Sequence, residues 1–361
     1  MLTVISIFVV YITLINSVIL LTFFFKKRFY QKIEESSLEK ASVIIAFRNE
    51  KENLPELIHS LKSQSLSPDN FEVIFVDDYS TDGSFEYLKS LIDEQTNFKV
   101  IKNKYEQGKK FALKTGIDEA RFDILIFTDA DCIPESNWLK SIVKAFDKET
   151  DIVYGYSPFL YEKNFMNKIC QYENLFTSVL MTAFHNVEFP YMSFGRNFAY
   201  RKSLFLQLGG YKQIEHSLSG DDDLFFQLAI KNGARAKLID DKDSIVYSKC
   251  KKTFRQFIRQ KSRHISASKF YSIELKSVLG LIYSANILLS LFIFPAFLFR
   301  DLFLITFIIL NWFIKSIEIF ILTRKLNINF PLIKIPLVDP LYFLSLIIIG
   351  IRSRFKIVRW K

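Results

Sequence analysis

The sequence lacks the residues that several kinds of site and scaffold require. Its 361 residues include three cysteines, and these have no paired spacing. Such usage fits a reducing compartment and excludes a fold held together by a framework of disulfides. His59, His185 and His216 show no ligand spacing, and no Ser/His/Asp or Cys/His arrangement of a covalent catalyst is visible.

Apolar and basic residues are what the chain has in excess. Hydrophobic residues make up 50% of it, Phe alone accounts for 38 residues, and the formal net charge is +10. The basic residues form clusters at 26–28 (KKR), 249–263 and 352–361 (RSRFKIVRWK), each beside a long apolar stretch. This arrangement favours anionic lipid headgroups as partners and argues against nucleic acid.

The N-terminal segment predicts a transmembrane anchor at residues 1–28. The stretch from Leu2 to Phe25 has no charged residue and is long enough to cross a bilayer as a helix. The KKR cluster that follows predicts that this end is cytoplasmic. A cleaved signal peptide is the alternative, but the basic residues follow the apolar run and no small-residue cleavage site is visible.

A second membrane region is predicted at residues 276–351, followed by a basic tail at 352–361. Its candidate spans are 278–299, 302–323 and the shorter 335–351, which contains Asp339. Lys315 and Glu318 interrupt the middle span and, at three residues apart, could pair on one helical face. If all four spans crossed the membrane, the basic tail would lie outside, against the positive-inside tendency. One C-terminal segment could therefore be re-entrant or lie in the membrane interface, and the sequence predicts two to three hydrophobic segments without fixing how many of them cross.

Residues 40–271 read as an α/β domain. Strand-like apolar runs occur in SVIIAF, FEVIFVDD, FKVIKN and DILIFTDAD, and helical patterns follow the first three of them. Strands that alternate with helices predict a mostly parallel sheet with helices on both faces. Ligands of such sheets bind beyond the carboxyl ends of the strands.

Polar side chains follow three of these strands at their carboxyl ends. They are Arg48, Asn49 and Glu50 after the first, Asp77 and Asp78 after the second, and Asp129 and Asp131 after the fourth. Two carboxylates one residue apart repel each other unless a positive charge lies between them. Because Mg²⁺ and Mn²⁺ accept a few carboxylates together with phosphate oxygens and water, the pattern predicts a divalent cation site.

Six motifs in order carry a resemblance to a known family. SVIIAFRNE, FVDDYSTDGS, GKKFALKTG, FTDADC, GDDDLF and QKSRH resemble the motifs of the family 2 glycosyltransferases, over roughly residues 41–264. The resemblance implies a GT-A (Rossmann-like) domain that binds a nucleotide-diphosphate sugar. One Asp-x-Asp alone is weak evidence, whereas six motifs in the family's order are specific.

The resemblance also implies roles for individual residues. The metal would be held by Asp129 and Asp131, and the general base would be Asp221, with Asp222 as the rival in a run of three aspartates. The segment GRNFAYRK would form part of the acceptor site. The nucleotide-sugar pocket would be lined by Ala46, Arg48, Glu50, Asp77, Asp78, Lys109 and Asp129.

One motif departs from the family. Where members have Gln-x-x-Arg-Trp, this chain has Gln260, Arg263 and His264, which would contact the acceptor or the diphosphate. The tryptophan form is associated with processive polysaccharide and lipid-linked synthases, so its absence puts processivity in doubt.

Each motif also has a purely structural interpretation. Asp77 and Asp78 could cap the following turn and helix, and Asp221 to Asp223 could be an acidic helix start. The Asp129 and Asp131 pair could be a solvated strand end. Residues 260–264 could be the polar face of a helix lying on a membrane, with neighbouring apolar residues inserted beneath.

These observations predict a membrane-bound, inverting glycosyltransferase. It would move a sugar from a UDP- or GDP-sugar to a lipid or lipid-linked glycan acceptor with Mn²⁺ or Mg²⁺. The multi-pass chain would lie in the inner (cytoplasmic) membrane with its catalytic domain in the cytosol. One alternative is a nucleotidyltransferase acting on sugar phosphates, although no Gly-rich phosphate loop with Arg or Lys follows the first strand. The other is a catalytically inactive membrane scaffold.

Overall fold

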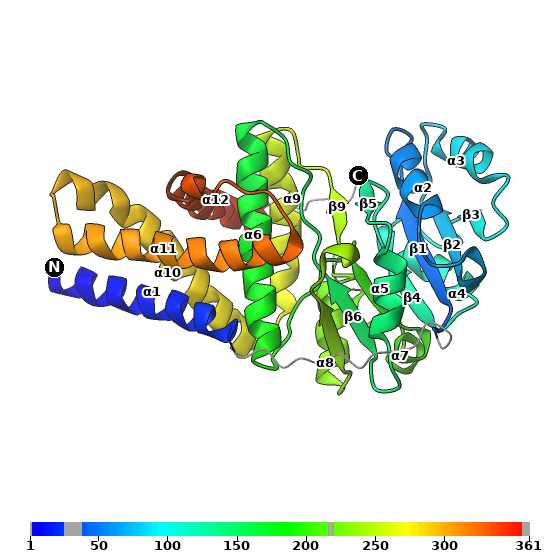
Figure 1. Cartoon of the computed structure of the whole chain (residues 1–361), viewed down its shortest axis with the longest axis horizontal. Coiled ribbons are helices and arrows are strands. Elements are labelled where there is room, and N and C mark those ends of the chain that lie inside the picture. The colour runs from blue at the N-terminus through cyan, green and yellow to red at the C-terminus, as the bar shows by residue number, and fades with distance from the viewer. Residues whose placement is uncertain (1, 25–37, 216, 218–219, 356–361) are drawn as a thin grey trace. The chain divides into compact units, whose positions relative to one another are not determined.

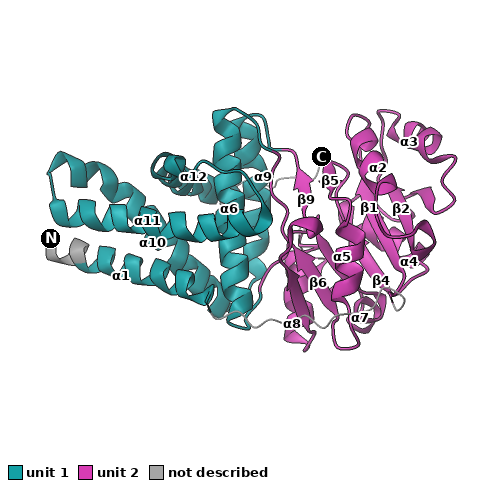
Figure 2. Ribbon diagram, in the orientation of Figure 1, with its two compact units in different colours: residues 1–27, 161–190, 250–358 teal, residues 28–160, 191–249, 359–361 magenta. Residues whose placement is uncertain are grey.

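The computed structural model of the chain describes residues 2–24, 38–215, 217 and 220–355 (Figure 1). The chain divides into two compact units. As Figure 2 shows by colour, unit 1 comprises residues 1–27, 161–190 and 250–358, and unit 2 comprises residues 28–160, 191–249 and 359–361. Unit 2 is therefore discontinuous in the sequence, and the domain bounds of 40–271 stay a prediction.

Unit 2 is an α/β domain. Its strands are β1 (Ala41–Phe47), β2 (Phe71–Asp77), β3 (Phe98–Lys102), β4 (Ile124–Phe127), β5 (Cys132–Pro134), β6 (Ile152–Gly155), β7 (Phe198–Arg201), β8 (Ala236–Ile239) and β9 (Val246–Ser248). Its helices are α2 (Leu54–Lys62), α3 (Ser84–Ile92), α4 (Lys109–Glu119), α5 (Trp138–Ala145), α7 (Lys202–Gln207) and α8 (Asp223–Lys231).

A seven-stranded sheet in the order β3-β2-β1-β4-β7-β6-β8 forms the centre of unit 2. Only β7 runs antiparallel to its neighbours β4 and β6, so the predicted mostly parallel sheet is confirmed. Every residue of β1 and β2 is buried, as expected for parallel strands covered on both faces. A second, two-stranded sheet pairs β5 with β9.

Helices cover both faces of the large sheet because its strand residues alternate in direction. Val43 and Ile45 belong to one core cluster with the buried residues of α2 and α5. Ile44 faces the other way, towards α4. A Cβ built on Gly116 of α4 would lie 2.5 Å from Cγ2 of Ile44, so glycine permits the helix to approach the sheet closely.

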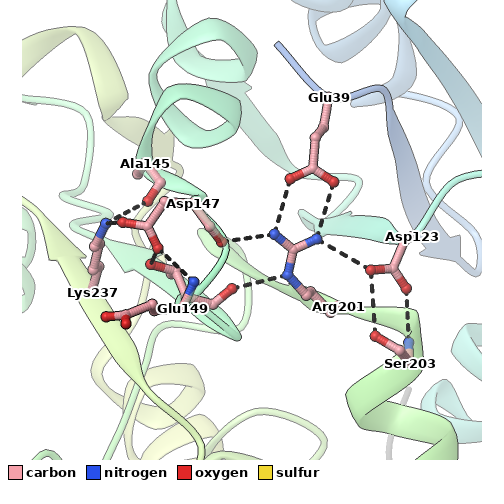
Figure 3. A network of polar contacts seen from close by, with 9 residues as sticks. Glu39, Asp123, Ala145, Asp147, Glu149, Arg201, Ser203 and Lys237 are labelled. Atoms are coloured by element: carbon pink, nitrogen blue, oxygen red, sulfur yellow. Dashed lines mark hydrogen bonds and ion pairs between the residues drawn. The ribbon is translucent and has the colours of Figure 1, made fainter. Parts of the chain in front are cut away.

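The amino edge of the sheet is closed by a charge network around Arg201 (Figure 3). The guanidinium binds both carboxylate oxygens of Glu39 at 2.9 and 3.1 Å, and one of Asp123 at 3.2 Å. It also donates to the backbone carbonyls of Asp147 and Thr150. These contacts tie the end of β7 to the start of β4 and to the segment before β6.

Unit 1 is helical. It contains α1 (Leu2–Thr22), α6 (Phe165–Asn186), α9 (Phe254–Ala267), α10 (Ile273–Leu298), α11 (Leu302–Leu326) and α12 (Ile335–Phe355). Within the described residues, three helices are long and apolar enough to cross a membrane, namely 273–298, 302–326 and 332–353. The apolar helix at 7–22 is shorter, so an N-terminal span stays a prediction. The KKR cluster at 26–28 and residues 356–361 of the basic tail lie outside the described residues.

Buried polar groups connect the helices of unit 1. Lys315 of α11 pairs at 2.5 Å with Asp339 of α12, and both side chains are 1% exposed. The hydroxyl of Tyr172 on α6 also donates to Asp339. The sequence suggested that Lys315 could pair with Glu318, but the structure pairs it with Asp339. The prediction considered only neighbours on one helix, whereas the true partner lies on the next helix.

Candidate active site

The predicted carboxylates of unit 2 meet at the carboxyl edge of the large sheet. Asp129 and Asp131 follow β4, and Asp221 and Asp222 precede α8. Asp129, Asp221 and Asp222 line one pocket, together with Lys109 at the start of α4. Because β1, β2 and β4 are parallel neighbours, their carboxyl ends bring polar residues from distant parts of the chain to this edge.

Lys109 is the positive charge between the carboxylates. Its Nζ lies 3.0 Å from Oδ1 of Asp129 and 2.9 Å from Oδ2 of Asp221. Burial alone would lower the pKa of Lys109, but the charges of Asp129, Asp221 and Asp222 raise this pKa well above its ordinary value. Lys109 therefore remains protonated and offsets the mutual repulsion of two carboxylates from different elements.

Asp221 and Asp222 have different surroundings. Asp222 is the N-cap of α8, where one of its carboxylate oxygens accepts the N–H of Asp223 at 2.8 Å and the other accepts that of Gly195 at 3.0 Å. Burial raises the pKa of Asp222 and the charge of Asp221 raises it further, whereas Lys109 and the two N–H groups lower it. Asp221 is 12% exposed and faces Lys109. Asp222 therefore has the helix-capping role that the structural interpretation gave to this run of aspartates, whereas the side chain of Asp221 contacts Lys109.

Gly195 is a site residue that the motifs did not single out. A Cβ at this position would lie 2.7 Å from Oδ2 of Asp222, so a larger residue would displace the carboxylate that Gly195 holds. This glycine belongs to the sequence GRN, but a glycine is required there because of its contact with Asp222, which lies 27 positions later in the chain. No local pattern signals such a contact.

The Asp-x-Asp pair has the arrangement of a cation site. One ligand atom each of Asp129, Asp131 and Cys132 lies within 4.8 Å of the others. Burial raises the pKa of the Cys132 thiol well above its ordinary value, and the charges of Asp131 and Asp129 add to this effect. The two carboxylates are the groups of this cluster that fit Mg²⁺ or Mn²⁺, because these ions prefer oxygen ligands.

Asp78 organises the loop that leads to Lys109. Its side chain is fully buried, and its oxygens accept the N–H of Gly108 at 3.0 Å and the amide of Asn103 at 2.7 Å. Burial raises the pKa of Asp78, and these two hydrogen bonds lower it in part. Asp77 accepts the N–H of Ser80 and so closes the turn after β2. The structure places both aspartates at the predicted edge and gives their oxygens partners within the protein.

The segment after β1 supplies the remaining predicted nucleotide-pocket residues. Ala46 is buried inside β1. Arg48 donates a hydrogen bond from Nη2 to the side-chain amide oxygen of Gln107 at 2.8 Å. Glu50 accepts the Asn53 amide at 2.6 Å, and its N–H donates to Ser84. Arg48 thus contacts the loop before Lys109, and Glu50 contacts α3.

The third predicted group lies in the other unit. Gln260, Arg263 and His264 are on α9 of unit 1, where Gln260 and Arg263 are half-buried and His264 is exposed. The apolar residues Phe257 and Ile258 of this helix are buried within the protein. Phe254 of the same helix is exposed, so a position of this helix at a membrane surface stays a prediction.

Comparison with known proteins identifies a segment that includes much of unit 2 and the residues 161–190 of unit 1. Residues 42–209 match the model of the family described as "Glycosyl transferase family 2". This segment is a family 2 glycosyltransferase domain. The match includes the segments that carry Glu50, Asp78, Lys109, Asp129 and Asp131, and it ends before Asp221.

Curated glycosyltransferases are similar to about a third of the chain. Glycosyltransferase AglE of Haloferax volcanii is 33% identical over 127 residues, which are 35% of this chain and 42% of that protein. Dolichol-phosphate mannosyltransferase of Pyrococcus furiosus is 34% identical over 116 residues, 32% of each chain. The matches thus span about a third to two fifths of the length of these relatives.

One solved structure matches nearly the whole chain in fold. It is the mannosyltransferase PcManGT from Pyrobaculum calidifontis, in complex with GDP-Man and Mn²⁺. The TM-score is 0.62, the sequence identity is 15%, and the match covers 97% of this chain and 99% of that one. At this identity the likeness shows the fold alone, which is the GT-A fold that the motifs implied.

Proposed function

We propose that the chain is a membrane-bound, inverting glycosyltransferase that moves a sugar from a nucleotide-diphosphate sugar to a lipid or lipid-linked glycan. The observation that carries the proposal is that Lys109 bridges Asp129 and Asp221, with Asp131 close to Asp129, at the carboxyl edge of a sheet that includes the segment matching the family 2 model. A nucleotidyltransferase is disfavoured by the helices of membrane-spanning length and by the absence of a Gly-rich phosphate loop with Arg or Lys in the sequence after β1. An inactive scaffold would not need its carboxylates to be retained.

Asp129 and Asp131 are the groups that would hold a divalent cation, because a carboxylate oxygen of each lies within 4.8 Å of the other and Mn²⁺ and Mg²⁺ prefer oxygen ligands. A bound Mn²⁺ or Mg²⁺ would offset the negative charge that develops on the departing diphosphate. The Mn²⁺ and GDP-Man of the structural neighbour support this assignment. Both GDP- and UDP-sugars fit the proposal.

Asp221 is the proposed general base. It lines the pocket with Lys109, and its side chain has no share in capping α8, which Asp222 performs. A carboxylate there would take the proton of the acceptor hydroxyl as that oxygen attacks the anomeric carbon. Attack on the face opposite the diphosphate would invert the anomeric configuration, and no covalent intermediate with the protein is needed.

Lys109 is the proposed positioning residue of the pocket. It contacts Asp129 and Asp221 simultaneously, so it fixes the separation between the cation-binding carboxylate and the base. Its place at the start of α4 depends on Gly108, whose N–H is held by Asp78. We therefore propose that Asp78 orders the loop before α4 and so positions Lys109 in the nucleotide pocket.

The acceptor is proposed to be lipidic because unit 1 has three helices able to cross a membrane by length and composition. The name of the Pyrococcus relative, dolichol-phosphate mannosyltransferase, supports the same class of acceptor. We place the chain in the inner membrane with unit 2 on the cytosolic side, where nucleotide sugars are made. A reporter fused after Arg28 should behave as cytoplasmic.

The test of the proposed function is transfer by the full chain purified in detergent. Labelled GDP-mannose, UDP-glucose and UDP-N-acetylglucosamine are each incubated with a polyprenyl phosphate and a polyprenol, with Mn²⁺ or with chelator. We expect Mn²⁺-dependent transfer from one donor, with a β-linked product from an α-linked donor as read by NMR. Retention of the donor's configuration, or adenylyl- or uridylyl-transfer to a sugar phosphate instead, would overturn the proposal.

A further inference from the structure

Arg196, in the segment that leads into β7, carries a positive charge held in a fixed position. Its guanidinium carbon lies 5.3 Å from the centre of the Phe159 ring and 5.2 Å from that of Phe194. Its Nε donates to Oγ of Ser157 at 2.5 Å, and Nη2 donates to the Ser157 carbonyl oxygen at 2.7 Å. Because these contacts already order the half-buried side chain, it loses little further freedom on binding a ligand.

The contacts of Arg196 are all with uncharged groups. Two are aromatic rings and two are oxygens of one serine, and no carboxylate forms an ion pair with Arg196 within the part of the chain that the structure describes. Arg201, five residues later, instead binds two carboxylates. Charges withdrawn from water in proteins are normally paired, so a half-buried arginine with neutral partners is suited to an external anion.

The position of Arg196 is next to both acidic groups of the site. The preceding residue, Gly195, donates its N–H to Asp222 at 3.0 Å. On the other side, Phe159, which lies against the guanidinium, forms a bridge with Ser248. Ser248 is in turn paired with Cys132, the residue directly after Asp131. These contacts connect the segment of the arginine both to the Asp-x-Asp pair and to the aspartates at the start of α8.

We propose that Arg196 binds a phosphate group of a substrate at this edge of the sheet. The inference rests on the proposed function, in which the site receives the diphosphate of the donor and a lipid or lipid-linked acceptor that can itself carry a phosphate. A phosphate close to several carboxylates is repelled unless cations separate them, and Arg196 is a cation in that place which no carboxylate of the described residues neutralises. The planar guanidinium can bind two phosphate oxygens at once.

The phosphate has two possible sources, the diphosphate of the donor and the phosphate of a lipid acceptor. Two probes separate them: GDP or UDP with Mn²⁺ represents the donor, and farnesyl phosphate represents the acceptor. Farnesol is the uncharged counterpart of the second probe. Binding is measured on the full chain in detergent by calorimetry, for the wild type and for Arg196→Gln and Arg196→Lys.

We expect Arg196→Gln to lower the binding affinity for one of the two phosphate probes by about tenfold or more, since a hydrogen bond to a charged group is lost. Arg196→Lys should lose less affinity for that probe, because lysine keeps the positive charge but lacks the planar guanidinium that binds two phosphate oxygens. Farnesol binding should not change. The matched control is Arg235→Gln, which removes an exposed arginine of the same unit and should bind both probes as the wild type does.

The inference is overturned if Arg196→Gln, with a wild-type Tm, binds both phosphate probes within about twofold of the wild type. If Arg196→Gln does not fold, Arg196→Lys decides: unchanged affinity for both probes overturns the inference, and a selective loss for one supports it. A wild-type chain that binds neither probe overturns the proposed function as well. Transfer activity in the wild type together with unchanged binding in the variants overturns only the role of Arg196.

Discussion

The two edges of the large sheet contain the same types of charged residue but differ in how many carboxylates share each cation. At the amino edge, Arg201 and Lys237 neutralise Glu39, Asp123 and Asp147 (Figure 3). At the carboxyl edge, Asp129 and Asp221 share the single cation Lys109 among the ion pairs of the described residues. Asp131 and Asp222 add to the negative charge there.

The difference shows how a site can be distinguished from a structural network. At the amino edge each of the three carboxylates is paired with a cation, and backbone carbonyl oxygens accept the cations' remaining donors. Such a network leaves little charge for a ligand to satisfy and stabilises the fold. A cluster with excess negative charge is unfavourable on its own and favourable when a divalent cation joins it. We therefore expect substitutions at the carboxyl edge to alter binding and turnover, and those at the amino edge to alter stability.

The largest effect is expected from Asp221→Asn. Without a base for the acceptor hydroxyl, turnover should fall by about 10²-fold or more, because general bases typically contribute that much. Donor binding should remain near the wild-type value, since the side chain acts on the acceptor. Turnover with saturating donor and a separate titration of the nucleotide measure the two quantities.

The rival Asp222 serves as the comparison for this prediction. Asp222→Asn should chiefly lower the Tm, because the N–H of Gly195 loses its charged acceptor and α8 loses its cap. If Asp222→Asn abolishes turnover at an unchanged Tm while Asp221→Asn leaves turnover intact, the assignment is wrong by one residue.

Asp131→Asn should raise the Mn²⁺ concentration required for half-maximal nucleotide binding by about tenfold or more. Loss of a group that only orients a ligand costs a metal site 10- to 100-fold, so loss of a ligand should cost at least as much. Asp123→Asn is the matched change at the amino edge and should leave the Mn²⁺ requirement unchanged. Equal Mn²⁺ requirements in the two variants would remove the distinction between the edges.

Arg201→Gln should lower the stability of the protein by about 2 kcal/mol, because the guanidinium's carboxylate and carbonyl partners lose their donor. Affinity for nucleotide with Mn²⁺ should stay within about twofold of the wild-type value. Thermal unfolding and calorimetry test both parts. A large loss of affinity at a wild-type Tm would mean that the amino edge takes part in binding.

The smallest effect is the pH dependence of Asp147. Burial would raise its pKa, but hydrogen bonds from Lys237, Thr150 and the N–H of Glu149 lower the pKa from 3.8 to about 2. Since the folded state has the lower pKa, the stabilisation is fully present above pH 3.8 and is lost as the pH falls towards 2. Asp147→Asn should be less stable than the wild type by about 1 kcal/mol at neutral pH, allowing for solvent screening.

The check is a comparison of the Tm values of the wild type and Asp147→Asn between pH 6 and pH 2. The difference should shrink as the pH falls through this range. A difference that is constant over the whole range would show that the charge of Asp147 does not stabilise the amino edge.

The sequence predicted those parts of the fold that local patterns determine. The apolar runs SVIIAF and FEVIFVDD correspond to β1 and β2, and the aspartates at the end of β2 and after β4 lie at the predicted edge. The antiparallel β7, inserted between β4 and β6, was not predicted as part of the sheet order, because strand order depends on pairing between distant segments.

The same limit applies to the site. The carboxylates were predictable because their spacing is local, and the place of Lys109 between two of them was not. Lys109 is close in space to Asp129 and Asp221 although 112 residues separate it from the latter in the sequence. The partners of Asp222 and Lys315 were missed for the same reason, since Gly195 and Asp339 are remote in the sequence.

The central claim is that the carboxyl edge binds a nucleotide diphosphate together with a divalent cation. Its most direct test is calorimetric titration of GDP and of UDP into the wild-type full chain, once with Mn²⁺ and once with chelator. We predict that one nucleotide binds at least tenfold more tightly with Mn²⁺, because the carboxylates otherwise repel the diphosphate. Equal affinity under both conditions would contradict the account and would reduce Asp129 and Asp131 to a solvated strand end.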